Sequence, residues 1–180
     1  MSKRSLRKEI IKKMKQFSEQ EQKLSADQYL TQQLMNTSEY KSAYRIGVVL
    51  SMQHEVDTYP IISKILNDDK KVFVPETNYK NKTMSFKELD NLSNIAPDDK
   101  GINYVTSDTE ITNDLDLLIV PGVVFNNKGY RIGYGGGYFD KFLSQHQQPT
   151  ISLIYDFQIN NFEIEAHDQP VQKLIIATTN

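Results

Sequence analysis

Four glycines lie within five consecutive positions of the chain, and charged residues flank them on both sides. Arg131 precedes the cluster and Asp140 follows it, and the glycines themselves are Gly133, Gly135, Gly136 and Gly137. Because glycine reaches backbone angles that side chains forbid, successive amide hydrogens in such a loop can turn towards one anion. A guanidinium suits phosphate oxygens, and a carboxylate suits the magnesium that accompanies a nucleoside triphosphate. The segment is therefore predicted to bind phosphate.

The glycine cluster matches neither of the two common nucleotide-binding motifs. Tyr138 stands where the dinucleotide fingerprint needs its third glycine, and the lysine of a P-loop is absent. A glycine-rich turn that only reverses the chain is an alternative that the glycines alone leave open. Arg131 and Asp140 favour phosphate binding over that alternative.

The glycine loop is expected to follow a buried strand and to lead into a helix. Asp116 to Val120 is rich in leucine, isoleucine and valine, and Pro121 and Gly122 end that run. Tyr138 to Leu143 reads as the start of a helix, whose N-terminus would add partial positive charge beside the loop.

A second strand end is expected beside the first. Residues 44–51 form an apolar strand pattern, residues 60–67 a helix with Thr58 as its cap, and residues 71–74 another strand. A strand, helix and strand in this order form a βαβ unit with parallel strands. Ligands of parallel sheets bind beyond the carboxyl ends of the strands, so the loop after residue 51 should share a rim with the glycine loop.

Two carboxylates follow that second strand and could face a ligand. They are Glu55 and Asp57. The alternative is an ordinary polar loop that caps the following helix.

The first fifteen residues are strongly basic, with Glu9 as their single acidic residue. The cations are Lys3, Arg4, Arg7, Lys8, Lys12, Lys13 and Lys15. A targeting peptide is one reading of such a segment. Leu6, Ile10, Met14 and Phe17 recur near helical spacing, which favours an amphipathic helix docked on the core. Its basic face is then either solvated or placed over a bound polyphosphate.

The remaining segments complete an α/β pattern. A helix is predicted over residues 19–36, with Ser18 and Glu21 at capping-box spacing. Further strands are predicted over residues 83–89, 102–107, 151–155 and 173–178, with a polar loop over residues 90–101. The expected fold is a three-layer α/β/α arrangement with a central, mostly parallel, Rossmann-like sheet. With 180 residues, the chain is expected to form a single domain over residues 1–180.

Composition narrows the kinds of function. The chain has no cysteine and only three scattered histidines, which argues against thiol catalysis, disulfides and zinc sites. A net charge of −2 argues against general nucleic-acid binding, and 38% hydrophobic residues without a long apolar run argue against a membrane span. A cytoplasmic monomer is expected.

Four separated segments together resemble the 5-formyltetrahydrofolate cyclo-ligase family. They are KRSLR at 3–7, LSMQHEVDT at 50–58, PGVVFNNKGYRIGYGGGYFD at 121–140 and AHD at 166–168. The third is the specific one, because its turn, arginine, glycines and aspartate follow the family order and spacing. VFVP at 72–75 and MSF at 84–86 extend the resemblance along the chain.

The resemblance implies an activity. Members of the family use ATP and magnesium to close 5-formyltetrahydrofolate into 5,10-methenyltetrahydrofolate, releasing ADP and phosphate. In that reaction the formyl oxygen is phosphorylated and N10 then attacks the activated carbon. A binding protein that keeps the loop without turnover, or another ATP-using enzyme on the same scaffold, is the alternative.

The resemblance also implies site residues, position by position. ATP contacts are implied for Lys3, Arg4, Ser5, Leu6, Arg7, Arg131, Ile132, Gly133, Tyr134, Gly135, Gly136, Gly137, Tyr138 and Phe139. Substrate contacts are implied for Leu50, Glu55, Tyr134, Gly135, Gly136, Gly137 and Tyr138. Catalytic roles are implied for Arg131, Tyr134 and Asp140, and magnesium ligation for Asp140 and Asp168.

The chain departs from the family pattern at a few positions. Phe139 replaces a frequent tyrosine, Gly136 replaces a loop lysine found in other members, and Gln172 stands where an aspartate is common. A frequent Glu-Pro pair is also missing from residues 101–108. None of these changes removes an implied ATP or magnesium contact.

Overall fold

The structure is a computed structural model that describes residues 1–179. Its centre is a seven-stranded sheet with the strand order β11-β10-β7-β1-β2-β3-β6. The strands are β1 (Arg45–Gly47), β2 (Lys71–Asn78), β3 (Thr83–Leu89), β6 (Ile111–Thr112), β7 (Leu117–Ile119), β10 (Thr150–Tyr155) and β11 (Lys173–Ala177). Two small hairpins lie outside this sheet: β4 (Ile95–Pro97) with β5 (Asn103–Val105), and β8 (Val124–Phe125) with β9 (Arg131–Ile132).

The sheet is mostly parallel, as the sequence predicts. Strand β1 pairs in parallel with both β2 and β7, and β10 pairs in parallel with both β7 and β11. Strands β3 and β6 add an antiparallel edge. The expected βαβ unit is confirmed, because a helix connects the parallel strands β1 and β2.

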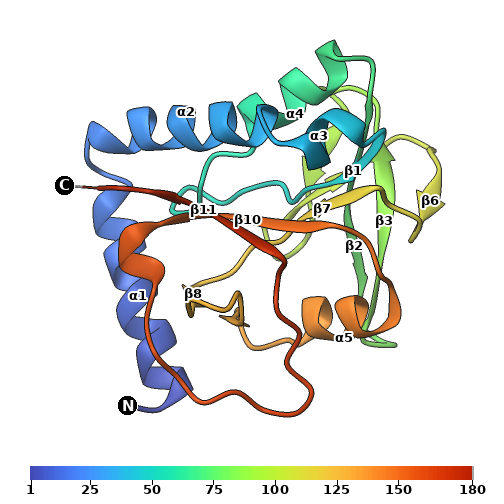
Figure 1. The fold of residues 1–180 in the computed structure, drawn as a ribbon. Coiled ribbons are helices and arrows are strands. Elements are labelled where there is room, and N and C mark those ends of the chain that lie inside the picture. The colour runs from blue at the N-terminus through green and yellow to red at the C-terminus, as the bar shows by residue number, and fades with distance from the viewer. Residues whose placement is uncertain (180) are drawn as a thin grey trace.

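Helices cover both faces of the sheet (Figure 1). They are α1 (Lys3–Phe17), α2 (Gln22–Met35), α3 (Ser38–Ser42), α4 (Tyr59–Asn67) and α5 (Tyr138–Gln145), with a short 3-10 turn η1 (Asp156–Gln158). Helices α2, α3 and α4 lie above the sheet in Figure 1, and α1 and α5 lie below it. The three-layer arrangement is therefore confirmed.

The side chains of strand β7, and of Val120 directly after it, point alternately into two hydrophobic clusters. Leu117 and Ile119 join the hydrophobic cluster under α2 and α4, whereas Leu118 and Val120 join the cluster under α5. Successive side chains of a strand point to opposite faces, so a run that is apolar throughout is buried on both sides.

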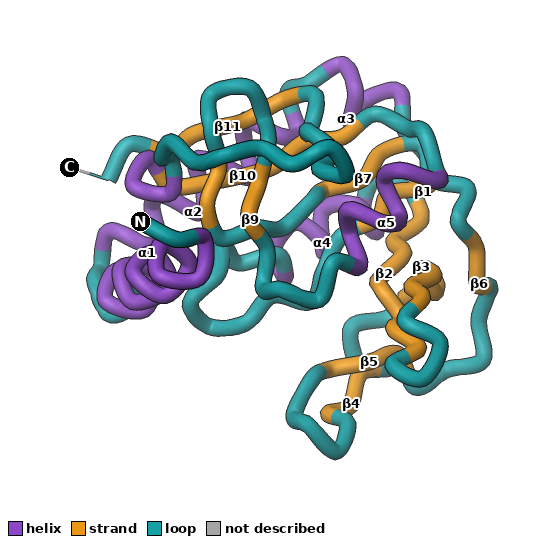
Figure 2. Tube along the Cα trace, turned by 90° about the horizontal axis from the view of Figure 1, so that it is seen from below, coloured by secondary structure: helices purple, strands orange, loops and turns teal. Residues whose placement is uncertain are grey.

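Helix α1 docks through the apolar face that its spacing predicts. Leu6, Ile10 and Met14 pack with Val124 and Ile132 of the β8–β9 hairpin. Figure 2 views α1 nearly along its axis, beside β9. The N-terminal basic segment is thus held against the hairpin that begins the glycine loop.

One predicted helix cap is wrong, and a second holds in position but not in its side-chain hydrogen bond. Ser18 does not cap α2: its hydroxyl donates to the Lys15 carbonyl, and α2 begins after Glu21 without a side-chain cap. Thr58 occupies the N-cap position of α4, but its hydroxyl donates to the Val49 carbonyl at 2.6 Å. Spacing alone could not show these competing acceptors, because each depends on how the neighbouring chain turns.

Several strand boundaries also differ from those predicted. The strand expected over residues 44–51 is paired only at Arg45–Gly47, and the chain then leaves the sheet towards a cleft. The segment expected as a loop, residues 90–101, contains β4. The sequence patterns also miss β6, β8, β9 and α3, which are too short for periodicity to reveal.

Across residues 1–179, the helices are each too short or too polar to span a bilayer.

Candidate active site

A cavity of about 650 Å³ opens beyond the carboxyl ends of β1 and β7. Its walls come from residues 49–53 and Glu55 after β1, from Pro121 after β7, from residues 131–140, and from the N-terminal end of α1. The rule for parallel sheets is therefore confirmed: the two loops share one rim. The walls are mixed, with apolar surface and a few converging polar groups, as in small-molecule sites.

Arg131 is the buried cation of this cavity. Strand β9 carries it, and its side chain is held by hydrogen bonding from Nε to the Pro121 carbonyl at 2.8 Å. Its Nη1 lies 3.5 Å from Asp140 Oδ1, and its guanidinium lies over the Phe139 ring. Burial lowers the pKa of Arg131, while the charges of Asp140 and Asp168 oppose that shift. The guanidinium stays protonated in proteins, so the site keeps a fixed positive charge.

The glycine loop runs from β9 into α5 and needs glycine for two different physical reasons. Gly135 and Gly137 have φ angles of 103° and 73°, a region that side chains disfavour. At Gly133 the reason is space, because a Cβ there would lie 2.6 Å from Arg131 Nη2. Gly137 is the N-cap of α5, so the loop ends at a helix N-terminus.

Helix α1 brings two of its cations to the cavity. Arg7 Nε donates to the Gly133 carbonyl at 2.7 Å, which ties α1 to the glycine loop. Lys3 Nζ lies 3.5 Å from Asp168 Oδ2 and 3.4 Å from Glu165 Oε1. Both cations are partly buried and line the cavity.

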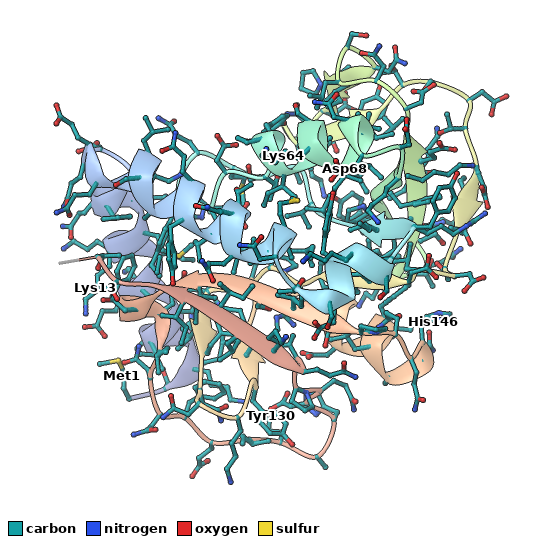
Figure 3. The ribbon with its side chains drawn as sticks, turned by 45° about the horizontal axis from the view of Figure 1, so that its top comes forward. Met1, Lys13, Lys64, Asp68, Tyr130 and His146 are labelled. Atoms are coloured by element: carbon teal, nitrogen blue, oxygen red, sulfur yellow. The ribbon has the colours of Figure 1, made fainter. Side chains whose placement is uncertain are left out.

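The other residues of the first implied ATP segment lie elsewhere. Arg4 and Ser5 are exposed, and Leu6 is in the hydrophobic cluster beneath α1. The rest of the basic face is solvated, as Lys13 shows on the outer side of α1 (Figure 3). The solvated reading therefore holds for these residues, whereas Lys3 and Arg7 face the cavity, where contact with a polyphosphate stays a prediction.

Glu55 faces the cavity from the loop after β1. It is only 9% exposed, and its Oε1 accepts the Met52 backbone N–H at 2.8 Å. Its Oε2 accepts the Tyr134 hydroxyl at 3.3 Å. Burial raises the pKa of Glu55, and these two donors partly offset the shift. Asp57 differs, because its Oδ1 accepts from Tyr59 N–H at 3.1 Å and so caps α4.

Tyr134 joins the two sides of the cavity. Its hydroxyl contacts Glu55 and also lies 2.9 Å from His54 Nε2. Burial, followed by the negative charge of Glu55, raises the pKa of the Tyr134 phenol, so the group is a neutral donor at neutral pH. His54 is the one member of this trio that the sequence patterns did not select, since a single loop histidine carries no spacing signal.

The two implied magnesium ligands, Asp140 and Asp168, both lie near Arg131. Their charges act on its guanidinium, and their side chains are 21% and 7% exposed. In the described part of the chain, no three His, Cys, Asp or Glu residues are placed to hold a metal ion. Magnesium typically takes one or two carboxylates together with phosphate oxygens and water. The pair is therefore compatible with a magnesium ion that arrives with a nucleotide.

Part of the cavity wall comes from residues without a clear sequence signal. Gly101, Ile102 and Asn103, from the turn and start of β5, line it together with Thr77 of β2 and Met84 of β3. Figure 2 shows the β4–β5 hairpin standing beside β2 and β3. A hairpin of two short strands gives no periodicity from which its position could be inferred.

The fold and the site define an α/β protein with a cleft at the carboxyl ends of parallel strands. On one side of that cleft, a glycine loop, a buried arginine and two helix-borne cations can hold a polyphosphate. On the other side, a buried carboxylate can accept hydrogen bonds from a second ligand.

Comparisons with known proteins agree with this class. The model of the 5-formyltetrahydrofolate cyclo-ligase family matches residues 1–177. The 5-formyltetrahydrofolate cyclo-ligase of Mus musculus is 31% identical over 189 residues, covering 97% of this chain and 93% of the mouse protein. The Haemophilus influenzae protein of the same name is 26% identical over 177 residues, covering 86% of this chain and 87% of its own. The chain belongs to the 5-formyltetrahydrofolate cyclo-ligase family.

Solved structures share the fold. The 5,10-methenyltetrahydrofolate synthetase of Aquifex aeolicus superposes with a TM-score of 0.82 at 25% identity, covering 99% of this chain and 90% of that one. The 5,10-methenyltetrahydrofolate synthetase of Mycoplasma pneumoniae superposes with a TM-score of 0.74 at 24% identity, covering 97% and 98% of the two chains.

Proposed function

We propose that the protein is a 5-formyltetrahydrofolate cyclo-ligase. It converts 5-formyltetrahydrofolate to 5,10-methenyltetrahydrofolate, using ATP and magnesium and releasing ADP and phosphate. The observation that carries the proposal is the single cavity in which Arg131 and the glycine loop face the buried carboxylate of Glu55. Family membership over nearly the whole chain supports the same activity.

The reaction explains why a polyphosphate site and a second-ligand site must adjoin. The formyl carbon is a poor electrophile, because the N5 lone pair is delocalised into the carbonyl. Attack of the formyl oxygen on the γ-phosphorus of ATP expels ADP and makes that oxygen a leaving group. N10 then attacks the carbon, the N10 proton is lost, and phosphate departs with the former formyl oxygen. Catalysis therefore consists mainly of alignment and charge stabilisation.

On the nucleotide side, the proposed residues supply positive charge and amide donors. Arg131 can stabilise the charge that develops on the transferred phosphoryl group, because its side chain is already held by Pro121. Lys3 and Arg7 reach the same cavity from α1. The side chains of Arg4, Ser5 and Leu6 lie outside the cavity walls. These residues would contact ATP only through their backbone atoms or after a shift of the helix end.

On the folate side, Glu55 is proposed to accept hydrogen bonds from adjacent donors of the pterin ring. A carboxylate can accept two such bonds at once. Leu50 lies in the same wall, and residues 134–138 of the glycine loop are proposed to contact both ligands. One loop would then hold the formyl oxygen in line with the γ-phosphate.

Asp140 and Asp168 are proposed to hold magnesium together with phosphate oxygens. The bound ion would neutralise phosphate charge during transfer. Asp140 lies in the first turn of α5 beside the loop, whereas Asp168 Oδ2 also contacts Lys3 and accepts the Glu165 N–H at 2.9 Å. Asp140 is therefore the more available ligand.

We also propose that the chain works as a single-domain monomer in the cytoplasm, without nucleic acid or membrane partners. The largest hydrophobic cluster draws on residues from Phe17 to Ala177, which supports one domain. A net charge of −2 supports the absence of nucleic acid. Size-exclusion chromatography with light scattering tests the monomer.

The activity is tested by following the absorbance of the methenyl product after mixing protein, ATP, magnesium and 5-formyltetrahydrofolate. Product should form only when all four are present, and Asp140→Asn should lower its rate on the order of a hundredfold, the effect of losing one strong transition-state contact. Binding of both ligands without product at high protein concentration would instead identify a non-catalytic binding protein. ATP turnover that does not depend on 5-formyltetrahydrofolate would identify a different ATP-using enzyme.

A further inference from the structure

We infer that His54 is a positioning residue, which holds the Tyr134 hydroxyl against Glu55 and thereby links the folate side of the cavity to the nucleotide loop. The inference rests on the proposed function, because it assigns Glu55 to the folate and the glycine loop to ATP. It adds a residue that is not among the proposed ATP or folate contacts. It also explains how binding of one ligand affects binding of the other.

The hydrogen bonds among the three side chains have a definite direction. A phenol has one hydrogen, and the Tyr134 hydroxyl donates it to Glu55 Oε2, which can only accept while ionised. The contact of 2.9 Å between that hydroxyl and His54 Nε2 must then be donated by the imidazole. The geometry assigns the Nε2–H tautomer to His54. Burial, together with the positive charges of Lys15 and Lys23, lowers the pKa of His54, so the ring is neutral.

The contact is a hydrogen bond rather than ring packing. The two ring centroids are 6.1 Å apart at 74°, a distant edge-on arrangement. Removing the imidazole should therefore act mainly through the Tyr134 hydroxyl and little through lost apolar contact.

His54 is on the better anchored side of this link. Ser51 and Thr58 close its loop, because the backbone N–H of each donates to the side-chain oxygen of the other, at 3.1 and 3.0 Å. The Asp57 N–H also donates to buried Asp27 on α2 at 3.3 Å. Tyr134, by contrast, lies between Gly133 and Gly135 in an exposed loop. The anchored loop after β1 therefore restrains the position of Tyr134 in the glycine loop.

This link predicts a coupling between the two ligands. A folate that hydrogen-bonds to Glu55 must either share Oε2 with the Tyr134 hydroxyl or displace that hydroxyl. The hydrogen bond from His54 then determines the position of the Tyr134 side chain. Because residues on either side of Tyr134 are proposed to hold phosphate, a folate that moves Tyr134 affects nucleotide binding as well. By linkage, ADP must change folate affinity by the same factor by which folate changes ADP affinity.

The contact itself is tested in the ligand-free protein, independently of activity. Imidazole ¹⁵N shifts can be followed for three histidines, since the chain has only His54, His146 and His167. Tyr134→Phe should move the Nε2 resonance of His54, which His54→Gln assigns by its disappearance. His146, at the end of α5 (Figure 3), and His167 should stay unchanged. An unmoved His54 resonance overturns the inference.

The functional consequence is tested by equilibrium binding of 5-formyltetrahydrofolate with and without ADP and magnesium. His54→Leu should weaken folate binding about three- to tenfold, the range expected for one hydrogen bond. His54→Gln keeps an N–H donor and should stay within about twofold of the parent protein. Both His54 variants should bind ADP alone within about twofold of the parent, because no folate then displaces Tyr134, and His54→Leu should reduce the coupling between the ligands.

A double-mutant cycle separates positioning from general destabilisation. In the Tyr134→Phe background, where the hydroxyl is gone, His54→Leu should have no further effect on folate affinity. An equal loss in both backgrounds, or no loss in the parent, overturns the inference. If the parent protein forms no methenyl product while the histidine resonance moves as expected, the proposed function fails and the structural link stands.

Discussion

At the scale of single residues, the site places a carboxylate where water is scarce. Glu55 is 9% exposed, and within residues 1–179 its carboxylate accepts from two donors, Met52 N–H and the Tyr134 hydroxyl. A buried carboxylate with unused acceptor capacity is destabilising for the fold but useful for a ligand that brings its own donors. Such a residue lowers the stability of the fold and strengthens ligand binding.

Glu55→Gln should therefore stabilise the protein at neutral pH while weakening folate binding. Burial raises the pKa of Glu55 in the folded state. The stability that this group contributes is fully present below its unfolded pKa of about 4.3, and is lost as pH rises through the raised folded pKa. Glutamine does not ionise, so the free energy of unfolding of the variant, relative to the parent, should increase over that pH interval. Urea denaturation at several pH values measures this difference.

Folate affinity should fall at least tenfold in the same variant, because a hydrogen bond to a charged acceptor is replaced. Asp57→Asn is the matched control, since Asp57 lies in the same loop but caps α4. Its folate affinity should match that of the parent. Unchanged folate affinity in Glu55→Gln would remove Glu55 from the site.

Residue types predicted part of this site and could not predict the rest. Arg131 was selected because a guanidinium beside a glycine loop suits phosphate oxygens. Glu55 was one of two loop carboxylates, and the family resemblance selected it as a substrate contact. His54 could not be selected, because its role depends on a hydroxyl 80 positions away in the chain. Residue types alone likewise left the roles of Glu55 and Asp57 open, and the turn of the loop separates them.

At the scale of elements, the glycine loop is shaped by both backbone angles and contacts. Gly137 needs its positive φ angle, while Gly133 needs space beside Arg131. The sequence predicted the strand before the loop from an apolar run that Pro121 and Gly122 end, and the helix after the loop from the residues that follow Gly137. It did not predict the short β8–β9 hairpin between them, whose β9 positions Arg131.

Alanine substitutions at these two glycines should therefore fail in different ways. Gly133→Ala puts a methyl group 2.6 Å from Arg131 Nη2, and the buried guanidinium must move. A displacement of this kind should lower kcat on the order of a hundredfold. At Gly137, by contrast, an added methyl group meets no atom of the described chain within 4 Å, and only backbone strain results. Gly137→Ala should cost about 1–2 kcal/mol of stability.

Steady-state kinetics and urea midpoints on both variants distinguish the two effects. A Gly133→Ala enzyme with the parent's kcat would show that Arg131 can relax without loss, and would contradict its proposed role. A Gly137→Ala protein as stable as the parent would show that the αL conformation is not required there.

At the scale of the whole molecule, the site depends on an element that is not part of the central sheet. Helix α1 lies against the β8–β9 hairpin and supplies Lys3 and Arg7 to the cavity (Figure 1). The layers and the parallel order of the βαβ unit followed from hydrophobic patterns. The hydrophobic patterns did not predict where α1 docks. The pattern of an amphipathic helix determines which of its faces is buried, but not which element covers that face.

Loosening α1 should consequently impair nucleotide binding without touching any cavity residue. Ile10 is 1% exposed in the cluster beneath α1, and Ile65 is fully buried in α4, so Ile10→Ala and Ile65→Ala are matched truncations. Each should cost about 2–5 kcal/mol of stability. Only Ile10→Ala should raise the KM for ATP, by about threefold or more, since it loosens the helix that carries two of the cations. Kinetics well below both unfolding midpoints measures this, and equal KM values in the two variants would show that α1 does not position the nucleotide.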